Sequence, residues 1–101
     1  MRLIVFFDLP TLTNTNLKDY RKFRKFLLEN GFIMMQESVY SKLVLNGNSS
    51  KVLKDKINKN LPPSGVVELM EITEKQFANI TYLVGNKRTN VVDSLDRVVE
   101  I

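Results

Sequence analysis

The feature that most constrains the fold is an uninterrupted run of apolar side chains near the N-terminus. From Leu3 to Phe7 the chain reads Leu-Ile-Val-Phe-Phe, and Asp8-Leu9-Pro10 follows directly. An apolar run of this kind, without polar alternation and closed by a turn sequence, predicts a strand that is buried on both faces. Any fold for this chain must therefore enclose residues 2–7 in its core.

Apolar periodicity predicts two helices after this strand. In the first, apolar residues recur every three or four positions, with Asn16 as the expected N-cap and Gly31 as the residue that ends the helix. In the second, Ser49 or Ser50 is the expected cap, and residues 62–65 end the helix. The apolar positions are Leu17, Tyr20, Phe23, Phe26 and Leu27 in the first helix, and Leu53, Ile57 and Leu61 in the second.

Three further segments have the composition of β-strands. Residues 32–45 contain two apolar stretches separated by Gln36-Glu37-Ser38, so they form either one long bent strand or a tight hairpin. Residues 66–72 predict a strand, and residues 80–84 predict a last short one. Between them, Thr73-Glu74-Lys75-Gln76 has the pattern of a capping box and predicts a single helical turn.

With the hairpin, the order of elements is β-α-β-β-α-β, the split βαβ arrangement of ferredoxin-like folds. We therefore expect an α+β fold in which both helices cover one face of a four-stranded antiparallel sheet. The other face needs a second cover, which a soluble chain would supply most simply by forming a homodimer. The candidates for that face are Phe6, Met34, Tyr40 and Met70.

The length of 101 residues fits a single domain, with a core in residues 1–84 and a polar, turn-rich tail in residues 85–101. The tail closes with a strand-like segment, which we expect to dock on a dimer mate or a partner as an added edge strand. The residues expected to dock are Arg97, Val98, Val99 and Ile101.

The chain contains no cysteine and no histidine. Disulfides, thiolate nucleophiles, zinc sites of cysteine or histidine, and imidazole bases are therefore excluded. The remaining catalytic means are carboxylates, hydroxyls, lysines, arginines and a hard metal held by carboxylates. The longest apolar run, residues 3–7, is far shorter than a membrane span or the apolar region of a signal peptide, so we expect a cytoplasmic protein without a membrane partner.

Positive charge is concentrated in one part of the chain. The net charge is +4, and residues 18–59 carry ten basic and four acidic side chains. This segment fits a surface that faces a polyanion, although a lysine-rich solvated surface explains many chains of this net charge. A dense basic face on the first helix and a basic pair before the tail are the candidate phosphate contacts. They are Lys18, Arg21, Lys22, Arg24, Lys25, Lys87 and Arg88.

Asp8 is the candidate for chemistry, because a buried strand delivers its carboxylate to a turn. One aspartate without further ligands is too little for Mg²⁺, which takes one or two carboxylates with waters and phosphates. In a two-fold dimer a residue near the axis meets its own copy, so two Asp8 carboxylates would share one ion. The alternative is a turn residue that caps nearby N–H groups. Ser38 and Tyr40 are candidates for positioning a phosphate or a water beside Asp8.

Taken together, several segments resemble the CRISPR-associated protein 2 family, the small subunit of the spacer-acquisition machinery. They are Phe6-Phe7-Asp8-Leu9-Pro10, the basic helix from Tyr20 to Leu27 that ends at Gly31, and Gln36-Glu37-Ser38-Val39-Tyr40. Three more segments resemble the variant of type II-A systems, and the resemblance spans nearly the whole chain. They are Asn60-Leu61-Pro62-Pro63, Thr73-Glu74-Lys75-Gln76-Phe77 and Tyr82-Leu83-Val84-Gly85.

The resemblance implies a ferredoxin-like homodimer whose two-fold axis brings Asp8 and its mate together around one Mg²⁺ ion. It also implies a partnership with the larger CRISPR integrase subunit, in which the homodimer bridges integrase dimers and its basic face supports the duplex DNA to be inserted. Many family members have tyrosine before the aspartate, where this chain has Phe7. That difference removes a hydroxyl near the site and leaves the metal assignment unaltered.

We therefore expect a CRISPR adaptation subunit with a Mg²⁺-dependent endonuclease or endoribonuclease site at Asp8. Its nucleic-acid partner is duplex DNA, with RNA as a second candidate. Two other functions remain open. A free-standing ribonuclease toxin on the same fold would cleave without an integrase, and a non-catalytic interaction module would form a dimer that responds to neither metal nor DNA.

Overall fold

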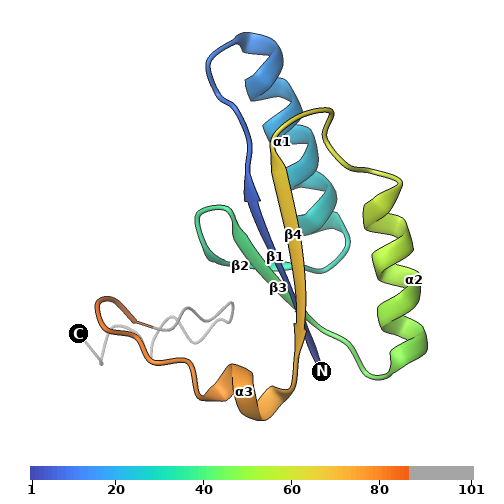
Figure 1. Ribbon diagram of the computed structural model, residues 1–101, viewed down its shortest axis with the longest axis vertical. Coiled ribbons are helices and arrows are strands. Elements are labelled where there is room, and N and C mark those ends of the chain that lie inside the picture. The colour runs from blue at the N-terminus through green and yellow to red at the C-terminus, as the bar shows by residue number, and fades with distance from the viewer. Residues whose placement is uncertain (87–101) are drawn as a thin grey trace.

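A four-stranded antiparallel sheet organises the structure, a computed structural model in which residues 1–86 are described (Figure 1). The strands lie in the order β2-β3-β1-β4. Their bounds are β1 Arg2–Asp8, β2 Ile33–Gln36, β3 Val39–Leu43 and β4 Val66–Ile72, and the helices are α1 Asn14–Glu29, α2 Gly47–Asn58 and α3 Glu74–Ala78. This order confirms the expected α+β, ferredoxin-like arrangement, and it shows that residues 32–45 form a hairpin.

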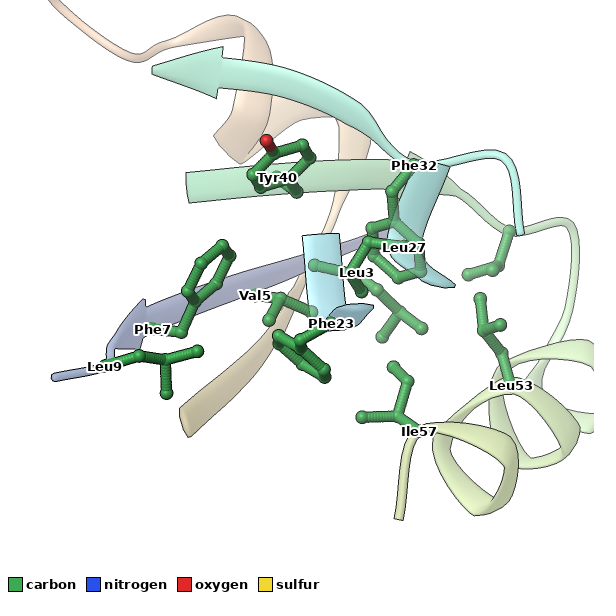
Figure 2. Close-up of a cluster of buried hydrophobic side chains, with 11 residues drawn as sticks. Leu3, Val5, Phe7, Leu9, Phe23, Leu27, Phe32, Tyr40, Leu53 and Ile57 are labelled. Atoms are coloured by element: carbon green, nitrogen blue, oxygen red, sulfur yellow. The ribbon is translucent and has the colours of Figure 1, made fainter. Parts of the chain in front are cut away.

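The core lies between the sheet and helices α1 and α2 (Figure 2). Strand β1 pairs with β3 on one side and with β4 on the other, so both of its edges are occupied. Leu3 and Val5 face the helices and are fully buried, and Ile4, on the opposite face, is only 3% exposed. The prediction of a strand buried on both faces is thus confirmed. The helices contribute Phe23, Leu27, Leu53 and Ile57 to this core.

Both long helices begin earlier than the sequence pattern predicts. The N-cap of α1 is Thr13 rather than Asn16, because the Thr13 Oγ1 accepts the Asn16 N–H at 3.0 Å and the Asn16 Oδ1 accepts the Thr13 N–H at 3.3 Å. The N-cap of α2 is Asn46, whose Oδ1 accepts the Ser49 N–H at 2.8 Å, rather than Ser49 or Ser50. In each helix an earlier polar residue satisfies free N–H groups of the first turn, so the expected caps lie inside the helix.

The predicted end of α1 is confirmed, whereas α2 ends before the last apolar residue predicted for it, Leu61. Gly31 adopts a φ of +86°, and the N–H of Phe32 donates to the Leu27 carbonyl at 3.0 Å, as in a glycine-terminated helix. Helix α2 ends at Asn58, three residues before Leu61. Leu61 therefore lies in the following loop and is 46% exposed.

Strand register decides which face of the sheet each side chain occupies. Tyr40 pairs with Val5, so it points to the helices and is 1% exposed, and Met34 pairs with Tyr40 and packs against the same core. The expectation that these two side chains face away from the helices is therefore wrong, because residues paired across strands share a face. Phe6 and Met70 do line the opposite face, as expected; we call it the open face.

Residues 80–84 do not form the predicted last strand. Helix α3 begins at the Thr73 cap, as the capping box predicts, and the chain then turns across the open face. There, residues 80–84 line a hollow together with Ile4, Phe6 and Met70. The segment lies over the sheet instead of pairing at its edge.

A polar contact ties α2 to the edge strand β4. The Ser50 hydroxyl donates to the Glu71 Oε1 at 2.7 Å, and the Lys54 Nζ lies 2.9 Å from the same oxygen. The hydrogen bond from Lys54, followed by that from Ser50, lowers the pKa of Glu71 below its ordinary value. Ser50, one of the two caps expected from the sequence, is instead buried at this contact.

Some expectations concern membranes or residues beyond position 86. Within residues 1–86, no helix combines the length and the apolar character needed to cross a membrane. The basic pair Lys87 and Arg88 and the docking residues Arg97, Val98, Val99 and Ile101 lie outside the described residues.

Candidate nucleic-acid interface and metal site

Asp8 is the last residue of β1 and lies at the rim of the open face. Its side chain falls on that face by strand alternation, since Phe7 belongs to the core on the other side. The Asp8 side chain is exposed, and within residues 1–86 it makes no hydrogen bond or ion pair. The described structure therefore gives no support to a role as a turn cap, and it leaves the carboxylate open to a ligand.

Glu68 is a second carboxylate on the open face, and it is not among the site residues predicted from the sequence. In the register of β1 and β4, Phe6 pairs with Glu68 and Asp8 pairs with Val66, so Asp8 and Glu68 occupy diagonal positions on one face. The alternation of Val66, Glu68 and Met70 along β4 was the signal that places Glu68 there. The rim of the open face thus carries two acidic side chains from neighbouring strands.

The oxygen atoms of Asp8 and Glu68 suit a hard divalent cation, provided that other molecules supply the remaining ligands. Mg²⁺ takes one or two carboxylates and completes its shell with waters and phosphates. Within residues 1–86, no three acidic side chains gather into a cluster that would hold a metal ion. A single chain therefore offers an open, incomplete site rather than a cage.

The β2–β3 turn lies beside the end of β1. Ser38 occupies this turn with a φ of +66°, and its carbonyl accepts the N–H of Phe7, the residue before Asp8, at 3.0 Å. The Ser38 hydroxyl lies 3.3 Å from the hydroxyl of Tyr20 on α1. The candidate Ser38 is therefore close to the Asp8 end of β1 through its backbone, whereas its side chain is engaged by Tyr20, which the sequence analysis placed only in the apolar stripe.

Tyr40 connects the sheet to the basic helix. Its ring stacks on the ring of Phe7, with centroids 5.6 Å apart, and its hydroxyl accepts a hydrogen bond from the Arg24 Nε at 3.0 Å. The sequence predicts Tyr40 beside Asp8 and Arg24 at a phosphate, whereas in the structure the two side chains bind each other. They are sixteen positions apart, and no local pattern links them.

The basic face of α1 consists of Lys18, Arg21, Lys22, Arg24 and Lys25, and all five side chains are exposed. None of them forms an ion pair in the part of the chain that the structure describes. The face starts near the Asp8 end of β1, because the ring of Tyr20 lies 5.6 Å from that of Phe7. Uncompensated cations on a rigid helix suit contact with phosphate groups.

A side chain at position 65 is expected to clash with the backbone at the Asp8 end of β1. Gly65 has a φ of +94°, and a Cβ added there would lie 2.6 Å from the Asp8 carbonyl oxygen and 3.0 Å from the Leu9 Cα. Backbone atoms cannot move aside as a flexible side chain does, so we expect Gly65→Ala to destabilise the fold by about 1–3 kcal/mol and to displace Asp8. Thermal unfolding measures the first effect, and the Mg²⁺-dependent cleavage that the sequence predicts at Asp8 tests the second.

Gly47 provides the matched control for this prediction. It is the first residue of α2, and a Cβ added there would meet nothing within 4 Å. Gly47→Ala should therefore leave both the melting temperature and cleavage close to those of the unaltered protein. A Gly65→Ala protein that melts and cleaves like Gly47→Ala would show that the close approach of Gly65 to β1 is unimportant.

Comparison with known proteins adds independent information. Residues 1–80 match the family model described as CRISPR associated protein Cas2. The chain is 48% identical over 99 residues to a CRISPR-associated endoribonuclease Cas2 of Treponema denticola, covering 98% of each chain. It is also 48% identical over 99 residues to the protein of that name in Streptococcus mutans serotype c, covering 91% of that protein, and 36% identical over 101 residues to the one in Lacticaseibacillus rhamnosus, covering both chains completely.

Proposed function

The chain belongs to the CRISPR-associated Cas2 family, and from this membership we propose that it acts as a nucleic-acid-supporting subunit in CRISPR spacer acquisition. In this proposal two copies form a homodimer, and the homodimer bridges copies of the larger integrase subunit. The basic face of α1 supports the backbone of the duplex DNA that is to be inserted. Integration itself is the work of the partner.

The observation that carries this proposal is the basic face of α1. Its five cations are exposed, and within residues 1–86 no acidic side chain pairs with them. A helix that is only solvated would gain by pairing these residues with the acidic side chains of the same helix, Asp19 and Glu29. A phosphate backbone supplies the missing negative charge, and it does so without regard to base sequence.

The open face supports the homodimer. Its apolar residues Phe6 and Met70, together with residues 80–84, line a hollow that α1 and α2 do not cover, and Met70 is 44% exposed. A second copy would bury this apolar surface. Because Asp8 lies at the rim of the same face, a two-fold axis near that rim would bring two Asp8 carboxylates toward each other.

We further propose that this rim hydrolyses phosphodiesters, as the name endoribonuclease says of the relatives. Asp8 and its copy would hold one Mg²⁺ ion, which when bound polarises a phosphoryl oxygen and acidifies a bound water. The cations of α1 would hold the substrate backbone beside this site. RNA and DNA both present the phosphate groups that this arrangement recognises.

Co-expression of the full chain with the larger integrase subunit tests the proposed assembly. We expect the chain alone to sediment as a dimer, and we expect an affinity-tagged integrase to retain it together with an added DNA duplex. Deletion of residues 97–101 should weaken retention by the integrase and leave the melting temperature of the core unaltered, because the tail is expected to dock on a partner.

Two results would contradict this assembly. A full-length chain that stays monomeric and does not bind the integrase would contradict the bridging role. A truncated chain that the integrase retains as well as the full-length chain would contradict the docking role of the tail, and the bridging role would then have to rest on other surfaces.

A further inference from the structure

The hydroxyl of Tyr40 makes an unusual contact for a core residue. The Tyr40 side chain is 1% exposed, and Figure 2 shows its hydroxyl oxygen directed away from the aliphatic part of the core. The hydroxyl accepts a hydrogen bond from the Nε of Arg24, an exposed residue of α1. The hydroxyl of a buried core residue thus contacts an arginine on the basic face of α1.

The Tyr40 hydroxyl is itself held in place. Its ring stacks on Phe7 at an interplanar angle of 23°, and Phe7 packs in turn against Phe23 and Tyr20. Strand β3 fixes the backbone of Tyr40 through its pairing with Val5. An acceptor anchored in this way restricts the rotamers of the arginine that donates to it.

The contact leaves the phosphate-binding part of Arg24 available. A guanidinium carries five N–H donors, and Tyr40 takes only the one on Nε. The four donors on the two Nη atoms have no partner within residues 1–86. Two parallel N–H groups from the Nη pair can bind a phosphate in a bidentate way.

We propose that Tyr40 is a positioning residue that orients Arg24 for a backbone phosphate. The inference rests on the proposed nucleic-acid function and deepens it, because it distinguishes one cation of the basic face from the others. Arg21 is the natural comparison: it lies one turn earlier on α1, is also exposed and has no side-chain partner within residues 1–86. Because the Tyr40 hydroxyl already restricts its rotamers, Arg24 loses less side-chain entropy on binding a phosphate than Arg21 does.

A double-mutant cycle between Tyr40 and Arg24 tests the proposal. Binding of a fluorescein-labelled DNA duplex of arbitrary sequence is measured by anisotropy for Tyr40→Phe, Arg24→Ala and the double variant. Tyr40→Phe removes only the hydroxyl and leaves the Nε of Arg24 to water. We expect it to weaken binding by about 2- to 12-fold, the equivalent of ordering one long side chain.

The coupling is the decisive quantity. In the Arg24→Ala background, Tyr40→Phe should change the affinity by less than about 2-fold, since the side chain that the hydroxyl orients is gone. A purely structural role for the hydroxyl would give the same loss in both backgrounds. As a direct readout, the Nε–H resonance of Arg24 should be protected from exchange in the unaltered protein and should lose that protection in Tyr40→Phe.

Arg21→Ala separates failure of this inference from failure of the proposed function. If Arg21→Ala and Arg24→Ala weaken binding but Tyr40→Phe does not, or does so equally in both backgrounds, the positioning role is wrong and the basic face remains the binding surface. If neither arginine variant alters binding, the proposed function is wrong and the positioning role falls with it.

Discussion

Asp8→Asn is expected to reduce Mg²⁺-dependent phosphodiester cleavage by on the order of 10³-fold, the rate equivalent of several kcal/mol of charge stabilisation. The substitution keeps the shape of the side chain and removes the negative charge that holds the ion. It should not disturb the fold, because the Asp8 side chain is exposed and makes no hydrogen bond or ion pair within residues 1–86. Duplex binding should also persist, since its proposed contacts lie on α1. Dimerisation should persist because it is proposed to rest on the apolar residues of the open face and not on the Asp8 carboxylate.

Asp55→Asn is the matched control for this experiment. Asp55 is exposed on α2 and undergoes the same change of charge and shape, far from the rim of the open face. Cleavage of a labelled RNA and of a DNA duplex should be unchanged in this control. Full metal-dependent cleavage by Asp8→Asn would show that Asp8 is not catalytic, and a loss of dimerisation would show that the two roles are not separable.

The triple substitution of Arg21, Lys22 and Lys25 by alanine is expected to abolish most of the affinity for nucleic acid. These three residues are chosen because none of their side chains makes a hydrogen bond or an ion pair within residues 1–86, so their replacement breaks no polar contact there. Alanine also favours the helix. Because phosphate contacts carry no sequence information, the affinity should fall to a similar extent for duplexes of different sequence, as measured by anisotropy.

Three exposed lysines outside α1 offer a control of equal charge. Lys51 and Lys56 lie on α2 and Lys75 lies on α3, and their replacement by alanine also removes three positive charges. If the basic face of α1 is the binding surface, this second triple variant should lose far less affinity than the first. Equal losses would indicate a general effect of net charge instead of a located interface.

The elements that local patterns define were predictable from the sequence. The apolar run at residues 3–7 identified β1, and the three- and four-residue spacing identified the buried side of α1. The helix starts were less predictable, because several polar residues precede each helix and any of them can cap it. Thr13 and Asn46 are the N-caps in the structure. Each lies one turn ahead of the expected cap and accepts a hydrogen bond from an N–H group that would otherwise be free.

Features that depend on register were not predictable in this way. The facing of Tyr40 follows from its pairing with Val5, and the alternation cannot be counted through the turn at Ser38 or through the irregularity between Met34 and Gln36. The same limit applies to the site. The position of Asp8 at the end of a strand can be predicted from the local sequence. Its diagonal position relative to Glu68 follows only from the pairing of β1 with β4.

The salt dependence of duplex binding tests the central claim most directly. The observed affinity of the unaltered chain is measured over a series of salt concentrations, together with that of the variant lacking Arg21, Lys22 and Lys25. If these side chains contact phosphates, the slope of log affinity against log salt should be shallower in the variant by about 0.9 for each lost contact, or about 3 in all. An unchanged slope and affinity would contradict the account and would leave the basic face of α1 as a solvated surface.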